Sequence, residues 1–147
     1  MDNIIDNLKS ALASEYRAFH MYRSSYYMIR GPLRSIVIDE LWEHSKEELD
    51  HASALEKRIA ELGGTTFSDH TEWDVWDADG HTPILSSDAA SILMTIKESE
   101  EKAVELYRDL YAKCEGDIVT QDIITDILKT EEEHLFDVKY NMMGYTE

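Results

Sequence analysis

The sequence predicts an all-α protein, a four-helix bundle in which two antiparallel helical hairpins are joined by a long crossover. Three observations predict this fold. Four segments rich in helix-forming residues carry apolar side chains at three- and four-residue spacings. Only two Pro and six Gly interrupt the 147 residues, and they fall at the ends of those segments or between them. Residues 63–86 lack a helical period, and a loop of that length in a compact domain usually has a structural reason.

The first helix is predicted at residues 3–30. Gly31-Pro32 ends it and opens the second helix at residues 32–62. The first apolar stripe is Leu8, Leu12, Phe19, Tyr22, Tyr26 and Ile29, and Glu15 interrupts it. The second stripe is Val37, Leu41, His44, Glu48, His51, Leu55 and Ile59. Both helices therefore carry polar side chains in the middle of a face that should pack against other helices.

Gly63-Gly64 begins the crossover, residues 63–86, which contains Trp73 and Trp76. Such a segment can run the length of the bundle, so that the third helix lies parallel to the second. The third helix is predicted at residues 87–114, capped by Ser87 or Asp88, and the fourth at residues 118–143. Their stripes are Ala89, Leu93, Ile96, Glu100, Ala103, Tyr107, Leu110 and Cys114, then Ile124, Ile127 or Leu128, Glu131, His134 and Val138. We expect residues 1–147 to form a single domain.

The motif Glu-x-x-His occurs twice, as Glu48-x-x-His51 and as Glu131-x-x-His134. On a helix, side chains three residues apart lie on one face, so each pair can reach a common point. Alone, either pair would more often be solvated. Two such pairs, together with one Glu from each of two further helices, form the inward-facing ligand set of di-iron carboxylate bundles.

In each predicted hairpin, the carboxylates of the two helices lie at the same distance from the turn. Glu15 and Glu48 are equidistant from the Gly31-Pro32 turn, each about 25 Å along its helix at roughly 1.5 Å per residue. Glu100 and Glu131 are likewise equidistant from the turn at residues 115–117. We therefore expect all four carboxylates and both histidines to meet in one layer.

The two halves also repeat one pattern, because Glu15-x-x-Ala18-x-x-x-Tyr22-Arg23 recurs as Glu100-x-x-Ala103-x-x-x-Tyr107-Arg108.

Some neighbouring residues allow alternatives. Glu98 would match the spacing of the first half better than Glu100, but its helical neighbours are charged, so we favour Glu100 as the ligand. His44 shares a face with Glu48 and is expected to support the centre rather than to be a seventh ligand. We expect exposed positions for three further acids, Glu47, Glu132 and Glu133. Cys114 is expected to be an inert core residue near a helix end.

Four buried carboxylates would be costly unless cations balanced their charge. Two divalent ions cancel four negative charges, and two neutral imidazoles complete the ligand set. Oxygen-rich ligation with two His suits iron or manganese and also admits zinc.

These six residues resemble the ligand set of the ferritin-like superfamily, most closely its bacterioferritin and mini-ferritin branch. The resemblance implies a ferroxidase centre that binds two iron ions per subunit and oxidises Fe(II) with O2 or H2O2, for iron storage, detoxification and protection from oxidative stress. It also implies that Glu48 and Glu131 bridge the metals, that Glu15 with His51 and Glu100 with His134 hold one ion each, and that Tyr22 can supply an electron.

Two departures from that family bear on the expected cofactor and on the expected number of subunits. Bacterioferritins carry a haem-binding Met directly after the Glu of the second helix, and Leu49 occupies this position, so we expect no haem by that route. Only 13 residues follow His134, too few for the fifth helix of 24-subunit cages. We therefore expect a homo-oligomer, a shell of 12 subunits in preference to a smaller assembly, with a dimer as the building unit.

Composition excludes other classes of function. Fourteen basic against 31 acidic residues give a net charge of −17, which argues against nucleic acid as a partner. A single Cys excludes an internal disulfide framework and a rubredoxin-type site. We see neither a secretion signal nor a membrane span, so we expect a cytoplasmic protein. Two alternatives remain, a rubrerythrin-like di-iron peroxidase that stores no iron and a bundle whose metal is structural.

Overall fold

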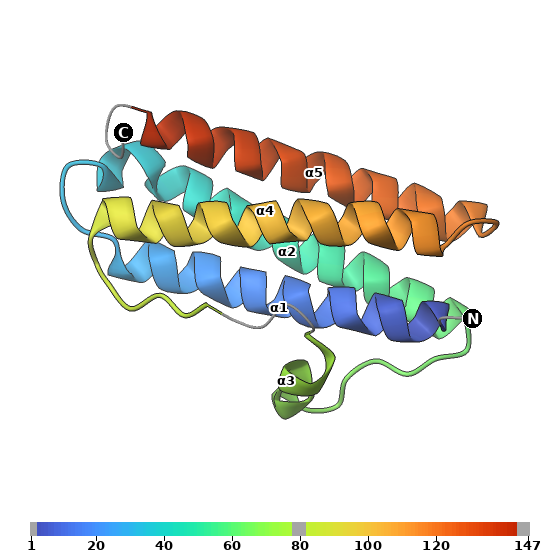
Figure 1. Ribbon diagram of the computed structural model, residues 1–147. Coiled ribbons are helices and arrows are strands. Elements are labelled where there is room, and N and C mark those ends of the chain that lie inside the picture. Colours follow the sequence, from blue (N-terminus) through green and yellow to red (C-terminus); the bar gives the residue numbers. More distant parts are fainter. Residues whose placement is uncertain (1–2, 78–81, 144–147) are drawn as a thin grey trace.

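The computed structural model describes residues 3–77 and 82–143. Four long helices form the bundle: α1 (Ile4–Met28), α2 (Arg34–Glu61), α4 (Ala89–Lys113) and α5 (Ile118–Met142). A 3₁₀ turn, η1 (His70–Glu72), and one short helix, α3 (Trp73–Trp76), lie in the crossover. Figure 1 shows α1 and α2 as one antiparallel hairpin and α4 and α5 as the other, so the predicted all-α four-helix bundle is confirmed.

The first hairpin turns over a longer segment than the sequence predicts. The helix expected to reach residue 30 ends at Met28, and the next begins at Arg34 rather than at Pro32. Gly31 adopts a φ of 98°, which favours glycine, and a residue preceding proline is disfavoured in the helical region. Arg30 instead donates its backbone N–H to the Ser87 carbonyl at 3.0 Å, which ties this turn to the end of the crossover.

The crossover runs back along the bundle, so that α4 lies parallel to α2 (Figure 1). No helix was expected in this segment, but the structure has the short η1 and α3 here. A capping box between Asp69 and Glu72 starts them. Trp73 then stacks on Tyr16 of α1, with ring centroids 5.1 Å apart, and Arg17 donates to Asp77 at 2.9 Å. Both contacts hold the crossover against α1.

The second hairpin follows its prediction closely. Asp88 caps α4 by accepting from Ser91 N–H, and Asp117 caps α5 by accepting from Thr120 N–H. Among the described residues, no helix is both long enough and apolar enough to cross a membrane.

A polar layer divides the apolar core into two clusters. One cluster, at the α1–α2 turn, includes Ile29, Leu41 and Ile96. The other, toward the α4–α5 turn, includes Leu12, Leu55 and Ile124. The buried Glu and His side chains described below lie between the two clusters, so apolar packing encloses them on both sides.

Candidate metal centre

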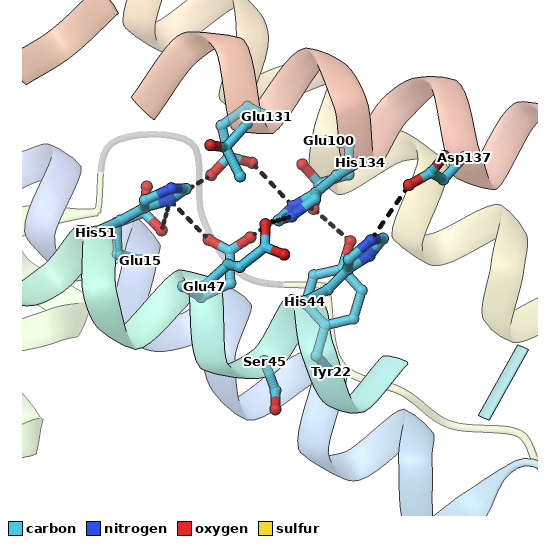
Figure 2. Close-up of polar contacts among 12 residues, drawn as sticks. Glu15, Tyr22, His44, Ser45, Glu47, His51, Glu100, Glu131, His134 and Asp137 are labelled. Atoms are coloured by element: carbon cyan, nitrogen blue, oxygen red, sulfur yellow. Dashed lines mark hydrogen bonds and ion pairs between the residues drawn. The ribbon is translucent and has the colours of Figure 1, made fainter. Parts of the chain in front are cut away.

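The structure brings the six predicted ligand residues together from all four long helices, in the middle of the bundle (Figure 2). All are buried, with exposed fractions between 0% and 8%. They are Glu15 on α1, Glu48 and His51 on α2, Glu100 on α4, and Glu131 and His134 on α5. Glu98, the rival of Glu100, is exposed. The positions follow from the helical period, since each residue occupies a core-facing place in its apolar stripe.

Around His51, three carboxylates converge on one ring nitrogen. His51 Nδ1 lies 3.0 Å from Glu131 Oε1, 3.5 Å from Glu15 Oε2 and 3.7 Å from Glu48 Oε2. These four side chains offer ligand atoms that all lie within 4.8 Å of one another. The group can therefore hold one metal ion after small side-chain rotations, because two ligands at roughly 2.1 Å from one ion lie at most about 4.2 Å apart.

The surroundings of His134 mirror this arrangement. His134 Nδ1 lies 2.9 Å from Glu48 Oε1, 3.7 Å from Glu100 Oε1 and 3.8 Å from Glu131 Oε2. These side chains form a second group of metal-binding atoms. Glu48 and Glu131 belong to both groups, so each has one oxygen near each histidine.

Unsatisfied buried atoms test whether this cluster fits metal ions. Nine buried side-chain N and O atoms of the described residues have no hydrogen-bond partner, and seven of them belong to the six residues above. They include Nδ1 of both histidines and both oxygens of Glu48. Buried polar atoms normally have partners, since each unpaired one costs on the order of 1–3 kcal/mol. The atoms that lack partners are those that would bind cations, so the donor set fits a pair of metal ions.

Two buried tyrosines connect the halves crosswise. Tyr22 of the first hairpin donates to Glu100 Oε1 of the second at 2.7 Å, and Tyr107 donates to Glu15 Oε1 of the first. Burial, followed by the nearby carboxylate charge, raises the pKa of both phenols well above its ordinary value, so both stay protonated and donate. Sequence reasoning singled out Tyr22 but assigned Tyr107 to packing. The repeated Glu-x₆-Tyr spacing is the signal that pairs them.

Glu47 is the contact that sequence reasoning missed. It was expected to be exposed, but its carboxylate accepts a hydrogen bond from His134 Nε2 at 2.9 Å while the side chain stays 39% exposed. A metal-binding histidine commonly donates its second ring N–H to a carboxylate, which fixes the ring and its tautomer. Glu47 therefore directs His134 Nδ1 at the centre. His44 supports the same ring by stacking on it, with centroids 3.9 Å apart.

The charges of the cluster are strongly coupled. Burial alone would lower the pKa of His51, but the adjacent Glu15 and Glu48 raise it to about 10. Burial would also lower the pKa of His134, but Glu100, Glu47 and Glu48 raise it to about 12.

The pKa values of the buried carboxylic acids are shifted in different directions. Burial, and then the charge of another Glu, raise the pKa of Glu15 and of Glu131 well above its ordinary value. Glu48 differs, because contacts with Glu15 and both histidines lower its pKa well below the ordinary value despite burial. Without metal, protons therefore supply the positive charge that the cluster needs.

Comparison with known proteins agrees with this geometry. The model of the Ferritin family, a ferritin-like domain, matches residues 5–141. The bacterioferritin of Desulfovibrio desulfuricans is 30% identical over 138 residues, which cover 90% of this chain and 70% of the bacterioferritin. A dodecameric thioferritin, the bacterioferritin-related protein from Bacteroides fragilis, superposes with a TM-score of 0.91 at 31% identity, over 95% of this chain and 83% of that chain. Dps from Listeria monocytogenes superposes with a TM-score of 0.88 over 95% of this chain and 93% of its own, and its 15% identity shows the fold alone.

Proposed function

This chain belongs to the ferritin family of ferritin-like domains, and we propose that it is a ferroxidase that oxidises Fe(II) at the buried centre. The observation that carries the proposal is the set of seven buried ligand atoms, enclosed by four helices, that lack a hydrogen-bond partner. Iron is the substrate. Each of two Fe(II) ions gives up one electron, and O2 or H2O2 accepts the two electrons together with two protons.

The distances support a separate role for each ligand. Glu48 and Glu131, which reach both histidines, are proposed to bridge the two ions. Glu15 with His51 holds one ion, and Glu100 with His134 holds the other. Four carboxylates balance the charge of two Fe(II) ions, so the filled cluster is close to neutral. Mn(II) and Zn(II) have compatible ligand preferences and are expected to compete for the same atoms.

The chain's own protons take part in this reaction. The two imidazoles must lose their Nδ1 protons before they bind cations, so binding releases protons that the oxidant can take up. Tyr22, which donates to Glu100 and whose ring lies 5.8 Å from that of His134, is proposed as an additional electron source. It would act when fewer than two Fe(II) ions are available.

The test is the initial rate of Fe(II) oxidation by the full chain, followed by the ultraviolet absorbance of Fe(III). Glu100→Gln should abolish the rate increase over protein-free buffer, because the ion beside His134 loses its own anionic ligand. Glu98→Gln, two residues away and exposed, is the matched control and should behave as the parent protein. Equal rates for the two variants would overturn the proposal. A variant at Glu100 that melted at a lower temperature but oxidised iron normally would indicate a structural metal instead.

We also propose that the chain assembles into a shell of 12 subunits and stores the oxidised iron. Support comes from the similarity to a structure described as a dodecameric thioferritin. Native mass measurement of the assembly tests this directly. A dodecamer that accumulates many irons per chain supports storage, whereas a dimer that holds two irons would favour the rubrerythrin-like peroxidase. Protection from oxidative stress and a cytoplasmic location remain predictions from the sequence.

A further inference from the structure

A separate group of metal-binding side chains lies on the face formed by α2 and α5, next to the buried centre. Glu40 and His44 are four residues apart on α2 and therefore share one helix face. Asp137 faces them from α5. One ligand atom from each of the three lies within 4.8 Å of the other two. Figure 2 shows the His44 and Asp137 side chains directed toward each other, on the side of His134 away from His51.

The chemistry of the group suits a cation. Two carboxylates and one imidazole are ligands that Fe(II), Mn(II) and Zn(II) accept. The carboxylates of Glu40 and Asp137 face each other, and burial together with this neighbouring charge raises the pKa of Glu40. A divalent cation between them would replace repulsion with attraction.

The side chains are also held in position. Asn141 donates its amide N–H to Glu40 Oε2 at 2.5 Å. The His44 residue is only 7% exposed and its ring is held by two aromatic contacts, a stack on His134 and an edge contact with Tyr22 at 5.3 Å. His44 Nε2 thereby stands 3.4 Å from Asp137 Oδ2. A buried, oriented imidazole beside two carboxylates differs from a chance cluster of surface acids, whose side chains move freely.

We propose that Glu40, His44 and Asp137 bind one divalent transition-metal cation, the third per chain. Asp137 is 37% exposed at its side chain, whereas the ligands of the buried pair are nearly inaccessible, so this third site exchanges its cation with solvent faster than the pair. Binding at the third site does not depend on the oxidation chemistry proposed above.

The experiment is a titration of the metal-free full chain with Mn(II), in which unbound Mn(II) is measured by electron paramagnetic resonance. Asp137→Asn should bind one equivalent per chain fewer than the parent protein, and Glu40→Gln should lose the same equivalent. Both substitutions preserve side-chain shape at partly exposed positions, and circular dichroism checks that the variants fold. Glu133→Gln, an exposed acid on α5, is the matched control and should bind as many equivalents as the parent.

A fourth variant separates this proposal from the ferroxidase. Glu131→Ala should lose the two equivalents of the buried pair and keep the one that Asp137→Asn removes. If Asp137→Asn and Glu40→Gln bind as much Mn(II) as the parent, the third site is overturned and the buried pair is untouched. If instead Glu131→Ala loses nothing while Asp137→Asn loses one equivalent, the third site is supported and the ferroxidase centre fails. Anomalous scattering from Mn(II) in crystals must then place an ion between Glu40, His44 and Asp137, and its absence there would contradict the assignment.

Discussion

The two halves of the buried centre come from one repeated hairpin, but their histidines have different surroundings. Toward the centre the halves match, because His51 Nδ1 lies 3.0 Å from Glu131 and His134 Nδ1 lies 2.9 Å from Glu48. Away from the centre they differ. His134 Nε2 donates to Glu47, and the His44 ring stacks on its ring. None of the described residues forms a hydrogen bond to His51 Nε2.

The difference separates the features that occur in both halves from those that occur in only one. Each hairpin supplies three of the six proposed ligands and one crosswise tyrosine, as expected if each half holds one ion. Of these two histidines, only His134 has a carboxylate, that of Glu47, hydrogen-bonded to its Nε2 atom within the described part of the chain. The counterpart of Glu47 in the repeat is residue 130, which is a threonine. The pKa of His134 is accordingly raised to about 12, against about 10 for His51. The His134 half is therefore the more firmly oriented one.

The largest effect is expected from a substitution that disrupts both groups of metal-binding atoms at once. Glu131→Ala deletes a carboxylate shared by the two groups, so both ions should be lost and Fe(II) oxidation should fall to the rate in protein-free buffer. Stopped-flow oxidation and metal content measure this. Glu133→Ala, two residues further on and exposed, should change neither quantity. Loss of one ion only would show that Glu131 is a terminal ligand and not a bridge.

A large effect is also expected from pH. Both histidine pKa values lie above neutrality in the metal-free protein, at about 10 and about 12, so both rings carry a proton that a cation must displace. Apparent affinity should therefore rise with pH between about pH 6 and pH 9, by roughly tenfold per pH unit for each proton released. Calorimetric titration with Zn(II) in buffers of different ionisation enthalpy counts those protons. A pH-independent affinity would mean that cation binding releases no proton from the histidines.

A moderate effect should distinguish the halves. Glu47→Gln removes the negative charge behind His134, which should weaken the ion on that side by roughly 10–100-fold and leave the ion beside His51 unchanged. Competition between the protein and a chelator resolves the two affinities. Glu43→Gln, an exposed acid one turn away, is the control. Equal weakening of both ions would show that Glu47 acts on the charge of the whole cluster rather than on one ring.

The smallest effect is expected from the tyrosines. Tyr22→Phe and Tyr107→Phe each leave a buried carboxylate oxygen without its donor, and each should lower the free energy of unfolding by about 1–3 kcal/mol. Only Tyr22→Phe should also slow oxidation by a few-fold, because Tyr22 contacts the His44 and His134 rings. Urea unfolding and oxidation rates measure the two properties separately. A rate loss in Tyr107→Phe of the same size would assign the electron supply to both phenols.

Much of this architecture could be predicted from the sequence. Helical period and turn residues predict the four helices, and the polar interruptions at Glu15 and Glu100 identify two of the buried carboxylates of the centre. The contacts of Glu47 and Asp137 could not be predicted, since both depend on how closely α2 approaches α5 rather than on either helix alone. The docking of Trp73 on Tyr16 is likewise a tertiary contact, and the four-residue α3 is too short to leave a period in the sequence.

Location of the bound ions tests the central claim most directly. Crystals of the full chain soaked in Fe(II) without oxygen, or in Mn(II), should show two anomalous peaks in the buried centre, in addition to the one proposed between Glu40, His44 and Asp137. One peak should lie between Glu15 and His51, the other between Glu100 and His134, with Glu48 and Glu131 bound to both ions. A single ion, or an interior without metal while ions occupy only the protein surface, would contradict the account.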